Sequence, residues 1–255
     1  MKNMNFLFVA GALALATPAL AEDFAWRGRL TAGQTLEVRG INGGITADAS
    51  GGEAEVTAVK KARNSDPASV EVRAVEHAGG VTVCAIYPGS GGRSNSCEPG
   101  NHGGSHMRNN DVQVEFTVKV PAGVKLKVHT VNGGVRVGEV ESDVDAASVN
   151  GSINVAATGL VKAETVNGSI EASMGRADWT GTLDFETVNG SISLDLPADL
   201  SADIDAETVN GRIEVDFPLG GNVHRTKREL RGTIGGGGRS LDLETVNGSI
   251  TLRKR

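Results

Sequence analysis

The feature that most constrains this chain is a short motif, ETVNGS, which recurs with little change along its second half. It occupies Glu164–Ser169, Glu186–Ser191 and Glu244–Ser249, and the copy at Glu207–Arg212 differs only in its last residue. A wider search finds Asn-Gly after Val or Ile at Asn42-Gly43, Asn132-Gly133, Asn150-Gly151, Asn167-Gly168, Asn189-Gly190, Asn210-Gly211 and Asn247-Gly248. Regular recurrence of one short unit predicts a repeat architecture.

Apolar and polar residues alternate on both sides of each Asn-Gly pair. Leu183 and Phe185 alternate with polar residues before one pair, and Ile192 and Leu194 do so after it. Alternation with a period of two predicts short strands with one buried face. Asn-Gly predicts the turn between them, because both residues adopt positive φ at low cost. By this reasoning, a valine at Gly190 would be strained by its backbone conformation.

Two architectures bury the same side chains. In a meander or sandwich of stacked hairpins, the two strands that flank each Asn-Gly turn would pair with each other. In a β-solenoid, each turn would be a corner, and successive copies would stack as rungs about 4.8 Å apart with ladders of Asn and Thr or Ser hydrogen bonds. We favour an all-β, single-domain β-solenoid, because it explains why the exposed residues of the motif are repeated as well as the buried ones.

Two features of the repeat are unusual for a solenoid. The last interval between turns is 37 residues, about twice the others, which predicts a degenerate copy near Gly232–Gly236. Stacking would also bring Glu164, Glu186, Glu207 and Glu244 into one column of like charges, which is destabilising when they are directly opposed. We expect a solvated acidic stripe there, since carboxylates alone do not make a Ca²⁺ site.

The start of the chain indicates export. Lys2 and a short apolar run, Phe6–Ala16, precede a small-x-small cleavage site that ends at Ala21. This pattern predicts a signal peptide over residues 1–21 and one mature β-repeat domain over residues 22–255, without a membrane span. The net charge of −6 argues against nucleic acid as a partner.

The two cysteines, Cys84 and Cys97, favour one disulfide in an exported chain. The disulfide would pin a Gly-, Ser- and Asn-rich loop over residues 88–110, and a loop of that length is often functional. His102 and His106 lie in this loop, but its glycines argue against the helix that would bring both rings to one metal ion. We therefore expect neither a metal site nor a cofactor.

No catalytic constellation is recognisable in the sequence. The acidic residues recur as the repeat does, and alternation places the pair Asp143 and Asp145 on the solvent face of a strand. The run Gly235–Gly238 is more typical of a turn than of a phosphate-binding loop. We expect no catalytic residues.

Three stretches together resemble a known bacterial family. They are the recurring TVNGSI, the VTVC strand at Val81–Cys84 and the phrase NDVQVEFTVKVPAGV at Asn110–Val124. The chain is similar over most of its mature length to the family called domain of unknown function 4097, which is labelled as adhesins. The resemblance implies an exported β-repeat protein of the cell envelope, with no established catalytic residues to carry over.

These observations predict a non-enzymatic envelope protein, in the periplasm or on the cell surface. It would present a flat polar face to a protein, a glycan or another copy of itself. One alternative is a polysaccharide-active enzyme on the same scaffold, which would need carboxyl groups converging about 5–10 Å apart in a cleft. Another is an accessory or sensor subunit whose loop 88–110 contacts a membrane partner.

Overall fold

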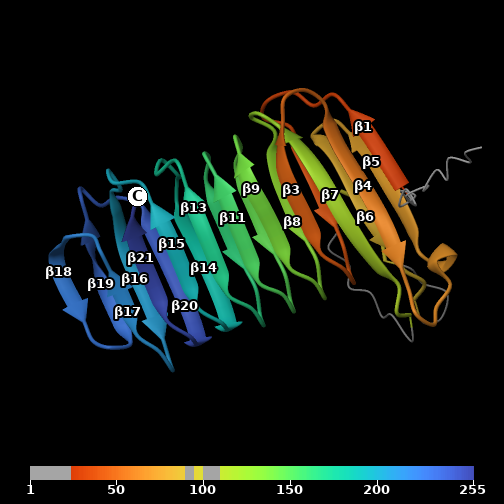
Figure 1. The fold of residues 1–255 in the computed structure, drawn as a ribbon. Helices are drawn as coiled ribbons and strands as arrows, with labels where there is room; N and C mark the ends of the chain where they lie inside the picture. Colours follow the sequence, from red (N-terminus) through yellow and green to blue (C-terminus); the bar gives the residue numbers. More distant parts are fainter. Residues whose placement is uncertain (1–23, 90–94, 100–109) are drawn as a thin grey trace, which may run out of the picture.

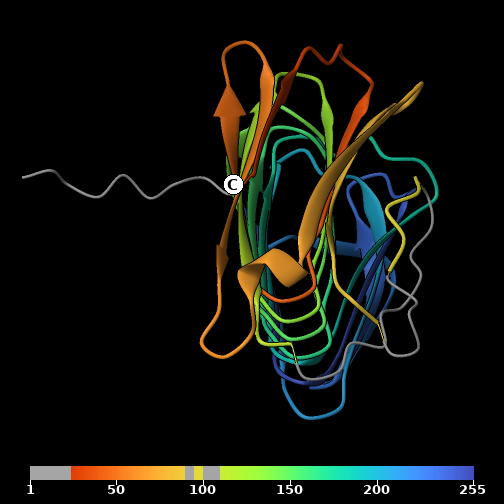
Figure 2. The ribbon, with the colours of Figure 1, turned by 90° about the vertical axis from the view of Figure 1, so that its right-hand side faces the viewer.

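The computed structural model describes residues 24–89, 95–99 and 110–255. Over these residues the protein is all-β, and two long sheets pack face to face along one axis (Figures 1 and 2). The single short helical segment in the described ranges is the 3-10 turn η1 (Pro67–Ser69). None of the described residues forms a helix of the length and hydropathy needed to cross a membrane. The expected signal peptide and its cleavage site lie outside the described residues.

Sheet A contains the strands that follow the Asn-Gly turns. Its spatial order is β1 (Phe24–Gly28), β4 (Ala54–Lys61), β7 (Gln113–Pro121), β3 (Ile45–Ser50), β9 (Val135–Val140), β11 (Ile153–Ala157), β13 (Ile170–Met174), β15 (Ile192–Leu196), β21 (Ile250–Lys254) and β17 (Ile213–Val215).

Sheet B contains the strands that precede the turns. Its spatial order is β18 (Leu219–Arg225), β19 (Glu229–Ile234), β16 (Ala202–Thr208), β20 (Ser240–Asn247), β14 (Thr182–Asn189), β12 (Val161–Glu164), β10 (Val144–Ala147), β8 (Lys125–His129), β2 (Thr35–Arg39), β6 (Gly80–Ile86) and β5 (Glu71–His77).

Each Asn-Gly turn is a corner that connects the two sheets. The turn after β14 leads into β15, yet these strands belong to different sheets and do not pair with each other. Instead, β14 pairs in parallel with β12 and β20, and β15 pairs in parallel with β13 and β21. The β-solenoid prediction is therefore confirmed, and the stacked-hairpin alternative is not the architecture of this chain. One strand from each sheet, with the turn between them, makes one rung.

The core lies between the sheets and is built from the inward positions of every rung. Ile153, Ile170, Ile192 and Ile250 follow one another in register across sheet A, and each is at most 1% exposed. Burying each such side chain contributes about 1.5–3 kcal/mol. Because identical positions stack on one another, every rung depends on its neighbours to cover its apolar side chains.

The last two rungs are stacked in the reverse of their chain order. The C-terminal rung, β20 and β21, lies between the rung of β14 and β15 and the rung of β16 and β17. The long interval before it is therefore not the degenerate copy that the spacing predicts. The chain instead leaves β17 into β18 and β19, an antiparallel hairpin that extends sheet B beyond β16, and then returns into the stack. Figure 1 shows these strands at the blue end of the molecule.

The disulfide loop replaces an Asn-Gly corner near the other end of the stack. Strand β6 pairs in parallel with β2 in sheet B, and β7 pairs in parallel with β3 in sheet A, so the loop connects the sheets as a turn does elsewhere. The predicted disulfide between Cys84 and Cys97 is confirmed, with a Cα–Cα distance of 5.6 Å. The predicted loop's residues 90–94 and 100–109, which include both histidines, lie outside the described residues.

A buried ion pair lies beneath the described part of this loop. Arg39 pairs with Glu37 at 2.8 Å, and both side chains are at most 10% exposed. Arg39 also donates to the carbonyl oxygen of Glu98 at 3.0 Å, and Thr82 donates to Glu37 at 2.9 Å. Since each charge has hydrogen-bonding partners, the pair is tolerated in the interior and holds the loop against sheet B.

Candidate functional site

The seven Asn-Gly turns form one continuous ladder along an edge of the stack. In six of the seven turns the asparagine Nδ2 donates to the Oδ1 of the asparagine in an adjacent rung at 2.7–2.8 Å, and within the ladder Asn42 only accepts. The ladder runs in the order Asn42, Asn132, Asn150, Asn167, Asn189, Asn247 and Asn210. The asparagine side chains thus act as a second set of rung-to-rung hydrogen bonds beside the backbone.

A second ladder lies just inside the first. The hydroxyl two residues before each of six asparagines donates to a glycine carbonyl of an adjacent rung at 2.7–2.9 Å. The donors are Thr130, Ser148, Thr165, Thr187, Thr208 and Thr245, all at most 5% exposed. Because these hydroxyls are buried, each hydrogen bond avoids the cost of an unsatisfied polar group.

The glycines of the turns serve a different purpose from the one expected. Among the seven, only Gly43 has a positive φ, of 118°. At Gly190 a Cβ would overlap the carbonyl oxygen of Gly168 in the adjacent rung, and the same overlap recurs at the other stacked turns. Glycine is therefore required by the close approach of neighbouring turns, and the expectation of positive φ at Gly190 is wrong.

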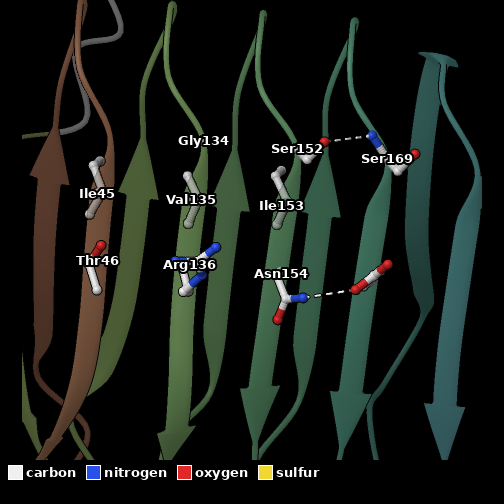
Figure 3. A pocket seen from close by; sticks show the side chains of 10 residues that line it. Ile45, Thr46, Gly134, Val135, Arg136, Ser152, Ile153, Asn154 and Ser169 are labelled. Atoms are coloured by element: carbon white, nitrogen blue, oxygen red, sulfur yellow. Dashed lines mark hydrogen bonds between the residues drawn. The ribbon is translucent and has the colours of Figure 1, made fainter.

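The outer face of sheet A carries a shallow polar trough, which is the best candidate for a binding site. Its first hollow, of about 420 Å³, crosses β3, β9, β11 and β13. Figure 3 shows Thr46, Arg136 and Asn154 in a row across it, below the small residues of the turns. A second hollow, of about 460 Å³, shares Asn154 and Glu171 with the first and continues across β15 and β21.

Regular strand pairing positions the side chains of this polar trough. The column runs in register through Thr46, Arg136, Asn154, Glu171, Ser193 and Thr251. Six strands at about 4.8 Å spacing make a row about 24 Å long. Hydroxyl, amide and charged groups thus repeat at a constant interval along a straight line.

Several groups in the polar trough hold one another in place. Asn154 donates to Glu171 at 2.8 Å, and Arg253 donates to Ser193 at 3.0 Å. Arg253 also lies 3.8 Å from a carboxylate oxygen of Asp195. Arg136 forms no ion pair with any other residue in the described ranges. A charged partner could therefore use Arg136 without breaking an existing ion pair.

The outer face of sheet B is more acidic. The four glutamates of the motif are directly opposed in the order Glu164, Glu186, Glu244 and Glu207. Basic side chains flank this column, since Lys162 pairs with Glu164 at 2.9 Å and Arg231 with Glu207 at 2.9 Å. Within the described residues, no group of three or more acidic, histidine or cysteine side chains could hold a metal ion.

The neighbouring aspartates of sheet B respond to their surroundings in opposite ways. Partial burial, together with the charges of Asp184 and Asp205, raises the pKa of Asp242 above its ordinary value. Hydrogen bonds from Gly238 N–H and the Thr233 hydroxyl lower the pKa of Asp203. Both carboxylates lie on the outer face of sheet B.

Sequence reasoning placed the turns but did not single out the residues of the polar trough. The turn residues lie beside it, at the edge where Gly134, Ser152 and Ser169 line its upper wall (Figure 3). The outward position four residues after each turn asparagine, as in Arg136 and Asn154, recurs in every motif copy. That position was a usable signal, because parallel in-register rungs bring equal positions together.

The fold and the surface define a class of protein, a two-sheet β-solenoid whose rungs present polar side chains at regular intervals. The chain belongs to the Toastrack DUF4097 family, whose model matches residues 45–253. No curated protein sequence matches it. A similar solved structure is that of a "putative cell adhesion protein" from Clostridium sporogenes. The two chains are 12% identical in sequence, the TM-score is 0.44, and the match covers 91% of this chain and 99% of that chain.

Proposed function

We propose that this protein is a non-enzymatic component of the bacterial cell envelope that binds an extended glycan chain along the polar trough of sheet A. The observation that carries the proposal is the continuity of the two hollows across six neighbouring strands. A straight row of hydroxyl, amide and charged groups suits a linear polymer better than a compact small molecule, for which enclosed pockets are typical.

The chemistry of the polar trough supports a glycan more than other polymers. Hydroxyl and amide side chains exchange hydrogen bonds with sugar hydroxyls, and Arg136 can pair with an acidic sugar. The net charge of −6 disfavours nucleic acid. Contacts of this kind are shallow, so we expect a modest affinity for each single sugar. The affinity for a long glycan should be higher, because many contacts are repeated along the chain.

The same surface supports binding without catalysis. A glycosidase needs two carboxyl groups facing one bond from opposite sides. In the polar trough, Glu171 accepts from Asn154, and Asp195 lies beside Arg253, on strands of a flat sheet. The disulfide supports placement in an oxidising compartment outside the cytoplasm.

The proposal is tested by binding to purified envelope polysaccharides, measured by co-sedimentation and on a glycan array. Thr251→Trp would fill the second hollow of the polar trough and should abolish retention. Thr182→Trp, an outward threonine on sheet B, is the matched control and should leave retention unchanged.

The outcomes separate the alternatives. Equal retention of both variants would show that the binding site is not on sheet A. Binding to envelope proteins alone would replace the glycan by a protein partner, and release of reducing ends from a bound polysaccharide would favour an enzyme. Loss of protein binding on disulfide reduction, with the repeat still folded, would favour the accessory subunit that acts through loop 88–110.

A further inference from the structure

The asparagine ladder is built from the dipeptide in which asparagine is chemically least stable. In Asn-Gly, the backbone nitrogen of glycine reaches the side-chain carbonyl carbon easily, because glycine has no Cβ in the way. The deprotonated nitrogen attacks Cγ, and ammonia leaves as a cyclic imide forms. Water then opens the imide to aspartate or isoaspartate. The net change consumes one water, releases one ammonia and requires no oxidant or enzyme.

Interior rungs of the ladder obstruct both parts of this reaction. An interior asparagine such as Asn189 donates to Asn167 and accepts from Asn247, so its side chain cannot turn toward glycine without breaking two hydrogen bonds. The attacking nitrogen is also engaged at several turns. Gly190 N–H, for example, donates to the carbonyl oxygen of Asn247 at 3.1 Å, and Gly168 N–H donates to that of Asn189 at 3.0 Å.

The two ends of the ladder differ. At the first end, the next rung of the stack covers Asn42: the Tyr87 hydroxyl donates to its carbonyl oxygen at 3.2 Å, and its Nδ2 lies 3.5 Å from the carbonyl oxygen of Val112. Gly43 N–H is engaged as well, donating to Asn132 at 2.9 Å. This end of the ladder is therefore closed.

The last rung, in contrast, is open. Asn210 donates to Asn247 at 2.8 Å, but no residue in the described ranges donates to Asn210 Oδ1. Gly211 N–H has no backbone acceptor there, which is also true of Gly151 and Gly248, so the missing side-chain bond is what distinguishes this rung. Its rung ends sheet A at β17, and the hairpin of β18 and β19 continues only sheet B. Asn210 is exposed, as the five interior asparagines are, but its side chain is held by one ladder hydrogen bond where each of theirs is held by two.

We infer that Asn210 is a site of spontaneous deamidation, and that stacking protects the other six Asn-Gly pairs. The product carboxylate cannot donate to Asn247 Oδ1, so the ladder loses its terminal hydrogen bond and gains a negative charge at the same place. The reversed order of the last two rungs makes the inference specific. If rungs stacked in chain order, Asn247 would be the exposed terminal residue.

The test is peptide mapping by mass spectrometry of the whole protein after incubation in mildly alkaline buffer, with a parallel sample in urea. In the folded protein, Asn210 should convert at least about tenfold faster than the mean of the other six, which corresponds to about 1.4 kcal/mol. In urea the seven rates should become similar, because local sequence alone then sets them. The six stacked sites serve as controls within the same chain.

A variant tests the cause of the protection. Asn247→Ala removes the donor to Asn189 and should raise conversion at Asn189 several-fold, while Asn132, farther along the ladder, keeps its slow rate. Circular dichroism checks that this variant still folds, and the wild-type comparison stands without it. The inference is overturned if Asn247 converts faster than Asn210 in the folded protein, or if all seven sites convert equally there.

Discussion

Replacement of Gly190 by alanine tests the close approach of neighbouring turns, on which the whole stack depends. The added Cβ would overlap the carbonyl oxygen of Gly168 and lie 2.8 Å from the backbone nitrogen of Ser169. Both are backbone atoms, so no flexible side chain can move aside to make room. The adjacent rungs must separate at this corner, and the hydrogen bonds between them must lengthen or break.

The expected cost follows from these contacts. Forcing extra volume into a packed site costs about 1–3 kcal/mol. Separation of the rungs also weakens the bonds from Asn189 to Asn167 and from Thr187 to Gly168, both 2.8 Å long. Each contributes about 0.5–1.5 kcal/mol. Since alanine also restricts the unfolded chain, which offsets about 0.4–1 kcal/mol, the net loss should be about 1–5.5 kcal/mol.

Urea unfolding followed by far-UV circular dichroism measures this loss. Gly52→Ala is the matched control, because Gly52 lies in an exposed turn where an added Cβ would have nothing within 4 Å and where φ is not positive. It should change stability by no more than about 0.5 kcal/mol. If Gly190→Ala is as stable as this control, the turns do not approach one another as described, and the reason given for the recurring glycine is refuted.

Four other changes follow from the same structure. Ile192→Asp places a charge at a position that is 0% exposed and should destabilise the fold by more than about 4 kcal/mol in urea unfolding, whereas the outward Ser193→Asp should have a small effect. The pKa of Asp242 is raised, so its ionisation costs stability as pH rises through the folded-state value; Asp242→Asn should therefore raise Tm at neutral pH, with the gain vanishing below about pH 3.8. The pKa of Asp203 is lowered, so Asp203→Asn should lower Tm at neutral pH and lose that effect as pH falls; the same sign for both variants would contradict the assigned causes. Deletion of residues 240–255 removes β20 and β21, through which β16 and β17 pair with the rest of the stack. It should abolish hydrogen-exchange protection of β17 and reduce that of β16, which keeps its antiparallel partner β19, and a synthetic peptide of the deleted residues should restore part of the protection. Unchanged protection in the truncated chain would contradict this role of the C-terminal rung.

The sequence by itself determined the content of each rung. Alternation around the Asn-Gly pairs identified inward residues such as Phe185 and Ile192, which are at most 1% exposed. Repetition of the exposed motif residues predicted the hydrogen-bonded ladders. Two cysteines in a chain with a predicted signal peptide predicted the disulfide that the structure contains. Such features are local, since a strand's buried face and a turn's chemistry depend on a few consecutive residues.

Only the tertiary structure decided which rung lies beside which. Every rung offers nearly the same ladder groups and apolar positions to its neighbours, so the motif does not state an order. The excursion through β18 and β19 returns β20 and β21 to the inside of the stack and leaves Asn210 at its open end. The reason for the recurring glycine also depends on a contact between rungs, with Gly168 for Gly190, and no pattern within one motif copy reveals that contact.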